Sequence, residues 1–343
     1  MLGAKTMVKM IDVAKLANVS TATVSRVLRN PDSVKKKTRD KVLESIEQLN
    51  YQPNVLARHF RRSKTNTILV IVPNIANTIF SQMVQGIEAT ASQNNYRVLL
   101  GNSNRNVEKE YDFLNILRQR QVDGMILLSG KIDRDTLQEL LEQYPIVLAS
   151  EYLKDVEMST VCINNIKCGK EATKHLLAQG HRRVAHISGP MNSMLSVDRQ
   201  GGYLEAMNEY GLKRDNRLIL EGDFSFESGY ERMKGFLRLK DRPTALFAAS
   251  DEMAMGAIKA AKAEGIAVPE ELAVVGFDDI RFSSIFEPGI TTVAQPAVEM
   301  GNTSMELLLK HIKDPAFKPE LIMLESEMII RESCGLKVKE ETR

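Results

Sequence analysis

Hydroxyl side chains and two arginines lie close together in the segment NVSTATVSRVLRN, which spans residues 18–30. Short hydroxyl side chains can donate hydrogen bonds to phosphate oxygens or to base edges, and an arginine can bind guanine through two hydrogen bonds. These residue types indicate contacts with DNA, provided that one helix face presents them together.

A helix that begins at Thr21 would present these groups on one face. Ser20 is a favourable N-cap residue for such a helix. An α-helix turns by about 100° per residue, which divides the segment into two sides. The buried stripe consists of Val24, Val27 and Leu28. The opposite side consists of Ala22, Ser25, Arg26 and Arg29.

Two further helices are expected beside this one. Apolar spacing predicts a short helix over Met10–Ala17 and a third over Thr38–Leu49, and a turn at 18–20 separates the first from the second. The inward residues predicted for the third helix are Val42, Leu43, Ile46 and Leu49. This arrangement is helix-turn-helix geometry, in which the second helix enters the major groove. We assign residues 1–52 to an all-α DNA-binding head.

The charge distribution separates this head from the remainder of the chain. The whole sequence has a net charge of +2, but residues 1–65 carry +9 and the remaining residues carry −7. The sequence therefore predicts that the head alone contacts a polyanion. A solvated three-helix cap without a ligand is the alternative interpretation.

A basic segment, residues 53–66, follows the head. Pro53 suits the first turn of a short helix, whose apolar side could be shared by Val55, Leu56, Ala57 and Phe60. Such a helix is too short to be stable alone. A flexible linker is the alternative.

From Ile68 onward, short apolar runs alternate with helical stretches such as 80–94 and 108–120. The predicted strands are 68–73, 96–103, 124–130, 145–150, 183–190, 217–224, 244–251 and 272–279. The alternation of strands and helices begins again near residue 183. This repeat predicts two parallel α/β subdomains within residues 67–335, followed by a flexible tail, 336–343.

The residues at the carboxyl ends of these strands are candidates for a binding site, because ligands of parallel sheets bind there. They are 74–80, 129–130, 188–199, 223–224, 250–251 and 278–279. Aromatic faces, an arginine, hydroxyls and carboxylates occur among them. This mixture suits a small polar ring such as a sugar or a nucleoside.

Several other classes of protein are disfavoured. The sequence lacks the G-x-G-x-x-G, G-x-x-x-x-G-K-[ST], G-x-S-x-G and H-E-x-x-H motifs, so we expect no enzyme. Cys162, Cys168 and Cys334 lack metal-site spacing, so we expect reduced thiols, no metal and no cofactor. No apolar run of 18 residues and no secretory signal are visible, which predicts a cytoplasmic protein without membrane contact, whereas a transport-type binding protein would need a signal peptide.

Three motifs carry a resemblance to a known family. They are D-V-A-x-x-A-x-V-S-x-x-T-V-S-R-V-L, T-R-x-K-V and Y-x-P-N-x-x-A-R, which begin at Asp12, Thr38 and Tyr51. Together they resemble the lactose/galactose repressor family of bacterial transcription regulators, and the resemblance continues along nearly the whole chain.

The resemblance implies roles for the head and for the basic segment. Thr21, Ala22 and Arg26 would contact base edges, whereas Thr23, Ser25 and Asn30 would lie near the backbone or the turn. Arg29 stands where the family often has asparagine. The basic segment would be a hinge helix that pairs with a second copy in the minor groove, with Phe60 as the wedge where the family usually carries leucine. The remaining implied DNA contacts are Tyr51, Asn54, Leu56, Ala57 and Arg58.

The body resembles the periplasmic sugar-binding fold that this family carries. The effector site would comprise Ile79, Phe80, Ser193, Arg199, Phe224, Ser250 and Asp278. Phe80 and Phe224 would stack on the effector, and Asp278 would bind its hydroxyls. Leu195 is apolar where a purine-binding member carries a polar contact, which argues against a purine effector. The strings TILVIVP, EGDFSFESG and VAQP look closest to the cytidine repressor branch.

The resemblance implies a transcription regulator of the repressor class, whose affinity for a roughly palindromic operator is controlled by a sugar or a nucleoside. Control by a protein corepressor is the alternative. We expect a homodimer, because one helix-turn-helix contacts only a few base pairs. The tail CGLKVKEETR has no leucine heptads, so a zipper-built tetramer is not expected.

Overall fold

The structure is a computed structural model that describes residues 8–51, 64–129 and 131–335, with the backbone alone for Arg29. The chain divides into two compact units, and the division lies between Thr65 and Asn66. We call them the head and the body.

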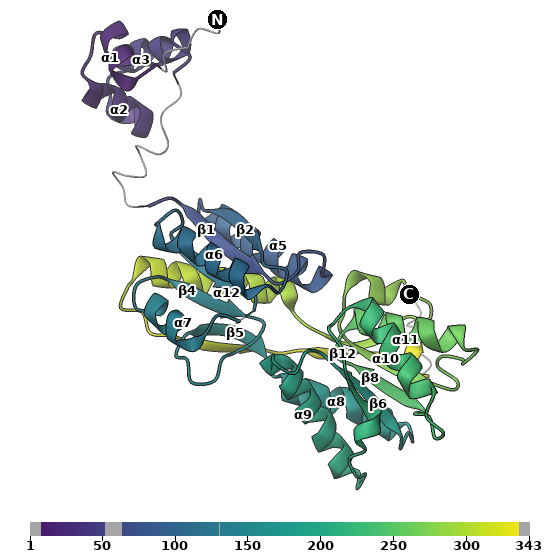
Figure 1. Ribbon diagram of the computed structural model, residues 1–343. Helices are drawn as coiled ribbons and strands as arrows, with labels where there is room; N and C mark the ends of the chain where they lie inside the picture. Colours follow the sequence, from purple (N-terminus) through teal and green to yellow (C-terminus); the bar gives the residue numbers. More distant parts are fainter. Residues whose placement is uncertain (1–7, 52–63, 130, 336–343) are drawn as a thin grey trace, which may run out of the picture. The chain divides into compact units, whose positions relative to one another are not determined.

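The head is a three-helix unit around a small apolar core (Figure 1). Its elements are α1 (Met10–Leu16), α2 (Thr21–Arg29), the 3-10 helix η1 (Pro31–Ser33) and α3 (Lys36–Gln48). The Oγ of Ser20 accepts a hydrogen bond from the backbone N–H of Thr23 at 3.1 Å, so the predicted N-cap is confirmed. The core contains Val13, Val24, Val27 and Val42, which confirms the predicted inner side of α2.

One predicted core residue of α3 is wrong. Leu43 is 47% exposed, whereas Ser45 is 5% exposed and donates its hydroxyl to the backbone oxygen of Lys41 at 2.8 Å. Leu43 lies about 100° around the helix from the fully buried Val42, so it falls outside the buried stripe. Ser45 can be buried because the preceding turn of the helix accepts its hydrogen bond.

The first sheet of the body has six parallel strands in the order β11-β5-β4-β3-β1-β2. Its strands are β1 (Thr67–Val72), β2 (Arg97–Asn102), β3 (Gly124–Leu127), β4 (Ile146–Ala149), β5 (Ser159–Ile163) and β11 (Leu321–Leu324). Strands β1, β3 and β4 are almost entirely buried, which accounts for their continuous apolar sequence.

The second sheet repeats this order as β12-β10-β9-β8-β6-β7, and only its edge strand β12 is antiparallel. Its strands are β6 (Val184–Ser188), β7 (Ile219–Glu221), β8 (Ala245–Ala248), β9 (Ala273–Asp278), β10 (Thr291–Ala294) and β12 (Glu327–Ile329). The predicted pair of parallel α/β subdomains is confirmed, and each of the eight predicted strands overlaps one strand of the two sheets. Strands β5, β10, β11 and β12 were not predicted.

Helices cover both sheets (Figure 1). The α-helices of the body are α5 (Thr78–Gln93), α6 (Val107–Arg118), α7 (Arg134–Leu141), α8 (Asn165–Ala178), α9 (Met194–Glu209), α10 (Phe226–Leu237), α11 (Asp251–Ala263) and α12 (Ala297–Lys313). The 3-10 helices are η2 (Asn216–Leu218), η3 (Arg281–Ser284) and η4 (Glu332–Cys334). Because α12 returns to pack on α5 in the first subdomain, the chain crosses between subdomains three times: after β5, after β10 and after β11.

The helix pair α8–α9 approaches at backbone contact distance. A Cβ atom added to Gly202 on α9 would lie 2.1 Å from the backbone oxygen of Ile166 on α8. A Cβ added to Gly169 on α8 would likewise lie 2.4 Å from the backbone oxygen of Arg199 on α9. Only glycine permits this spacing, which fixes Arg199 against α8.

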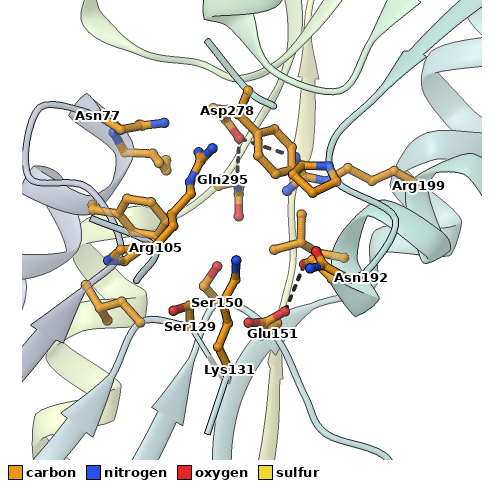
Figure 2. A pocket seen from close by; sticks show the side chains of 18 residues that line it. Asn77, Arg105, Ser129, Lys131, Ser150, Glu151, Asn192, Arg199, Asp278 and Gln295 are labelled. Carbon is orange, nitrogen blue, oxygen red and sulfur yellow. Dashed lines mark hydrogen bonds and ion pairs between the residues drawn. The ribbon is translucent and has the colours of Figure 1, made fainter. Parts of the chain in front are cut away.

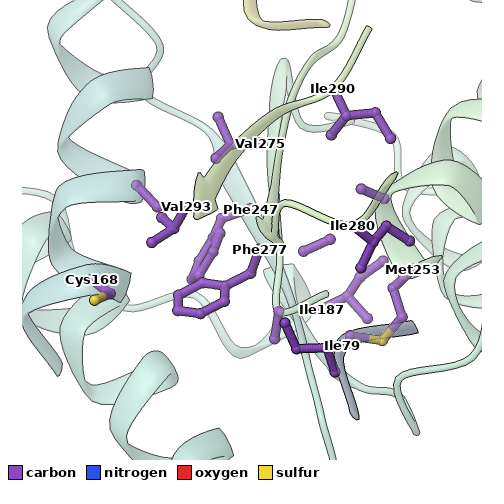
Figure 3. Close-up of a cluster of buried hydrophobic side chains, with 14 of the residues drawn as sticks. Ile79, Cys168, Ile187, Phe247, Met253, Val275, Phe277, Ile280, Ile290 and Val293 are labelled. Carbon is purple, nitrogen blue, oxygen red and sulfur yellow. The ribbon is translucent and has the colours of Figure 1, made fainter. Parts of the chain in front are cut away.

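Figure 3 shows part of the buried apolar cluster of the body, around β8 and β9 of the second subdomain. Phe247 and Phe277 are fully buried there, with ring centroids 6.4 Å apart. Their packing holds β8 and β9 in a fixed position, and both strands end at the candidate site.

Candidate functional site

The outward side of α2 carries four of the thirteen predicted DNA contacts. Thr21, Ala22 and Arg26 are exposed, and Ser25 is half-buried. Their side chains thus form an accessible surface of short hydroxyl, methyl and guanidinium groups, which is the chemistry that reads base edges.

Three other residues that were predicted to contact DNA take part in the structure of the head itself. The Oγ1 of Thr23 lies 2.9 Å from the Oγ of Ser20, within the N-cap of α2. Asn30 is the C-cap of α2, and Tyr51 is only 7% exposed within the core of the head. Five predicted contacts and one side chain lie outside the described residues: Asn54, Leu56, Ala57, Arg58, Phe60 and the side chain of Arg29.

A cavity of about 750 Å³, counting the part open to solvent, lies between the strand ends of the two subdomains. Six of the seven predicted effector residues line it: Ile79, Phe80, Ser193, Arg199, Phe224 and Asp278. Leu195 also lines it, so its apolar side chain contributes to the wall.

Ser250 is not among the lining residues. It is the N-cap of α11, and its Oγ accepts a hydrogen bond from the backbone N–H of Met253 at 3.2 Å. The same hydroxyl lies 3.4 Å from the backbone oxygen of Phe224, to which it donates. Ser250 therefore acts on the cavity through the backbone of a lining residue.

Asp278 and Arg199 meet on one wall of the cavity, as Figure 2 shows. The Nη1 of Arg199 lies 3.6 Å from the Oδ1 of Asp278, and the Nε2 of Gln295 donates to the same oxygen at 2.6 Å. Asp278 is 6% exposed, and burial raises its pKa to about 6, while Arg199 and Gln295 oppose this shift. This carboxylate is therefore a strong acceptor with a small solvent shell, suited to hydroxyl groups of a ligand.

Several contacts fix the position of the Arg199 side chain. Its Nε donates to the Oδ1 of Asn165 at 2.9 Å, and its Nη1 donates to the backbone oxygen of Ala249 at 2.7 Å. Its guanidinium carbon lies 3.5 Å from the ring centroid of Phe277. Burial lowers the pKa of Arg199, and the charge of Asp278 opposes this shift. These contacts keep the cation in place.

A second buried carboxylate supports the loop after β9. Asp251 is fully buried and accepts hydrogen bonds from the backbone N–H of Ile280 at 3.0 Å and from the hydroxyls of Ser283 and Thr292, each at 2.6 Å. Burial, followed by the charge of Asp278, raises the pKa of Asp251. Because all three partners donate, Asp251 fixes the turn in which Asp278 lies.

The opposite wall belongs to the first subdomain. Figure 2 shows Ser129, Lys131, Ser150 and Glu151 together on this side of the cavity. The Oγ of Ser193, from the second subdomain, donates to the Oε2 of Glu151 at 3.0 Å. A hydrogen bond thus crosses between the two walls.

Among the lining residues outside the predicted strand-end ranges, four carry charged or amide side chains: Arg105, Lys131, Glu151 and Gln295. Each follows a strand, namely β2, β3, β4 and β10. Their position at strand ends was the available signal, although β10 itself was not predicted.

Two lining side chains have polar atoms without a protein partner. Neither the Oε1 of Gln295 nor the Oγ of Ser129 has a hydrogen-bond partner among the described residues, and both atoms are buried. Gln295 as a whole is 9% exposed. Since a buried polar atom without a partner costs about 1–3 kcal/mol, these atoms indicate a place for polar groups of a ligand.

Among the residues that the structure describes, no group of three or more His, Cys, Asp or Glu side chains could hold a metal ion. None of the helices in the described part of the chain is long and apolar enough to span a membrane.

Comparisons with known families agree with this division of the chain. Residues 9–54 match the family described as "Bacterial regulatory proteins, lacI family". Residues 173–334 match "Periplasmic binding protein-like domain".

Curated relatives match along nearly the whole length. The "HTH-type transcriptional repressor CytR" of Escherichia coli (strain K12) is 39% identical over 330 residues, which are 96% of this chain and 97% of that protein. "Catabolite control protein A" of Priestia megaterium is 36% identical over 95% of this chain and 99% of that protein. These relatives confirm the prediction that this chain is a transcription regulator and not an enzyme.

Solved structures give the same result. The lac repressor dimer bound to operator and the anti-inducer ONPF has a TM-score of 0.86 at 28% identity, and covers 96% of this chain and 99% of that chain. The complex of the transcriptional regulator CelR with cellobiose has a TM-score of 0.73 at 34% identity. This match covers 95% of this chain and 99% of that chain. The chain therefore belongs to the lacI family of bacterial regulatory proteins.

Proposed function

We propose that this protein is a DNA-binding repressor whose operator affinity is controlled by a sugar or a nucleoside bound in the cavity of the body. The observation that carries the proposal is the buried Oε1 of Gln295, which has no donor among the residues that the structure describes and lies next to the carboxylate of Asp278. Two adjacent acceptors would match the hydroxyl groups of a sugar or of a ribose.

A small molecule fits these observations better than a protein corepressor does. Gln295 and Asp278 are 9% and 6% exposed, so the surface of a folded partner would not reach them. Phe80 and Phe224 add apolar ring faces to the same cavity. The cellobiose named for the CelR complex supports a sugar, and the similarity to CytR supports a nucleoside.

In this proposal residues 1–52 bind the operator, residues 53–66 form the hinge helix and linker, and residues 67–335 bind the effector. Thr21, Ala22 and Arg26 contact bases, with Phe60 as a wedge in the minor groove. Because the protein acts on chromosomal DNA, it works in the cytoplasm. The ligand changes the angle between the two subdomains and thereby the distance between the hinge segments of a dimer. Its effect is limited to its differential affinity for the two arrangements.

A homodimer on a roughly palindromic operator is part of the proposal. Leu99 and Leu100 on the edge strand β2 are 43% and 36% exposed, and Phe282 and Ile285 at η3 are 49% and 69% exposed. Exposed large apolar side chains in both subdomains suit an interface with a second copy. The solved lac repressor dimer supports this state.

The dimer is tested by Leu99→Glu, with Leu321→Glu as a matched control on β11, the opposite edge strand of the same sheet. Leu321 is 61% exposed, so a charge there is equally accessible to solvent. Sedimentation should show a monomer for Leu99→Glu and a dimer for Leu321→Glu. Dimers for both variants would place the interface elsewhere.

The effector is tested by measuring thermal stability with a panel of neutral sugars and nucleosides. A ligand of the cavity raises the melting temperature of the wild type by mass action. Asp278→Ala should abolish this shift, whereas Glu139→Ala, an exposed change on α7, should retain it. A shift that persists in Asp278→Ala would show that the ligand binds elsewhere.

A further inference from the structure

Arg105 connects the two subdomains at the cavity. It belongs to the loop between β2 and α6 in the first subdomain, and its Nη1 donates to the backbone oxygen of Asp223 in the second. Its guanidinium carbon lies 5.6 Å from the ring centroid of Phe224, which also lines the cavity. Figure 2 shows Arg105 among the lining side chains.

The loop that carries Arg105 is held in place. Asn104 and Arg105 both have left-handed backbone conformations, with φ of 51° and 56°. The backbone N–H of Arg105 donates to the oxygen of Pro73, directly after β1, at 3.0 Å. Asn106 then caps α6. The arginine therefore extends from a fixed turn.

The second subdomain presents acidic side chains to the guanidinium group of Arg105. Burial raises the pKa of Glu252, and the charge of Arg105 opposes this shift. Burial also acts to raise the pKa of Asp223, but hydrogen bonds from Ser225 and Ser228, together with the charge of Arg105, lower it overall. Both carboxylates belong to the second subdomain. A cation of one subdomain thus faces two carboxylates, a carbonyl oxygen and an aromatic ring of the other.

Phe224 has little freedom to move away from Arg105. Its φ is 68°, a left-handed conformation that side chains rarely adopt. A Cβ added to Gly189 would lie 1.9 Å from the Cζ of Phe224, so the ring lies directly on the backbone of Gly189. The ring has Gly189 and Arg105 as neighbours, and its position relative to the cavity depends on both.

We propose that Arg105 is a positioning residue that latches the two subdomains across the cavity and holds Phe224 in place for the effector. This inference rests on the proposed function only for the identity of the ligand, since the latch itself consists of protein atoms. Loss of the latch should open the cleft and weaken effector binding together.

The latch is tested by the distance between spin labels at Asp112→Cys on α6 and Lys259→Cys on α11. Both native residues are exposed, and Cys162, Cys168 and Cys334 are buried. Labelled protein is mixed with an excess of unlabelled protein, so that each dimer carries one labelled chain. The distance distribution then reports the opening of one cleft without any ligand.

Arg105→Ala should lengthen and broaden this distribution. Arg105→Lys should restore most of the closure, because it retains the charge opposite Asp223 and Glu252. Arg134→Ala, an exposed arginine on α7, should match the unmutated protein. A distribution for Arg105→Ala equal to that of the unmutated protein would overturn the inference.

Ligand titration gives the second readout, with D-ribose, cytidine and cellobiose as probes. For a probe that binds the wild type, Arg105→Ala should weaken binding about 10- to 100-fold. Arg105→Lys should remain about 3- to 10-fold weaker, because an ammonium does not stack flat on Phe224. Equal affinities for wild type and Arg105→Ala would also overturn the inference. If no sugar or nucleoside binds while the label distance responds as expected, the latch stands and the proposed function fails.

Discussion

The contact between α8 and α9 predicts opposite effects for the same substitution at two adjacent residues. Gly201→Ala places a Cβ with no atom within 4 Å, so it should only gain helix propensity. The free energy of unfolding should rise by about 0.5–1 kcal/mol. Gly202→Ala places a Cβ 2.1 Å from the backbone oxygen of Ile166 and 2.6 Å from the backbone nitrogen of Lys170.

These distances at Gly202 lie below the 3.0 Å that real Cβ contacts keep, so the helices must separate by about 1 Å. Neither neighbouring atom belongs to a flexible side chain. Overpacking of this kind costs about 2–4 kcal/mol after the gain in helix propensity. Urea unfolding followed by circular dichroism measures both variants against the wild type.

The same separation should affect the cavity. Arg199 lies on α9, less than one turn before Gly202, and its Nε donates to Asn165 on α8 at 2.9 Å. Moving the helices apart stretches this hydrogen bond, so Gly202→Ala should also weaken effector binding, whereas Gly201→Ala should leave it unchanged. Unfolding midpoints that shift in the same direction by similar amounts would refute the claim that α8 and α9 meet at backbone contact.

Four other changes test separate parts of the molecule. Arg26→Ala should cost about 1–3 kcal/mol on operator and little on random DNA in fluorescence anisotropy, and equal losses would make it a phosphate contact. Effector affinity should fall as the pH drops through about 6, where Asp278 takes up a proton, and Asp278→Asn should remove this dependence in titration calorimetry. Because burial raises the folded pKa of Asp278 above the ordinary 3.8, its contribution to stability should show the opposite trend: the unfolding free energy of the wild type relative to Asp278→Asn should fall by about 2 kcal/mol from pH 4 to 6, and a difference that does not change with pH in urea titrations would contradict this. Asp251→Ala should cost about 3–5 kcal/mol of unfolding free energy, since three buried donors lose their acceptor, and a change below 1 kcal/mol would contradict this. Phe60→Ala should reduce operator bending in a gel-shift assay without changing effector affinity.

Local signals in the sequence were sufficient for the elements of the head. Ser20 as N-cap and the stripe of Val24 and Val27 follow from capping chemistry and helical periodicity, and both are present. Leu43 was misplaced because apolar character alone does not show how wide the buried stripe is. Only the packing partners determine that width.

The strands of the body were predicted where they are long apolar runs. Periodicity does not separate β5 from its surroundings, since its sequence STVCI mixes hydroxyls with apolar residues although all five are buried. The hydroxyl of Ser159 lies 2.6 Å from the Nε2 of His311, a tertiary contact, and that of Thr160 donates to the backbone oxygen of Met158 at 3.1 Å. Strands β11 and β12 are short edge strands that follow each other without an intervening helix, so the alternation of strand and helix does not mark them.

The candidate site was predictable in part. Asp278 and Arg199 follow from strand-end position and family resemblance together, and the cavity brings them within ion-pair distance. Arg105 could not be found in this way, because its partners Asp223 and Phe224 are more than 100 residues away in the other subdomain. How two subdomains face each other is a tertiary property that no local pattern encodes.

Operator titration with and without effector tests the central claim most directly. The DNA site is first selected from random sequences with the wild-type protein, and its affinity is then measured across the panel of sugars and nucleosides. We expect one class of compound to change wild-type operator affinity about 5- to 150-fold, and to leave that of Asp278→Ala unchanged. An equal response in Asp278→Ala, or no response of the wild type to any sugar or nucleoside, would contradict control through this cavity.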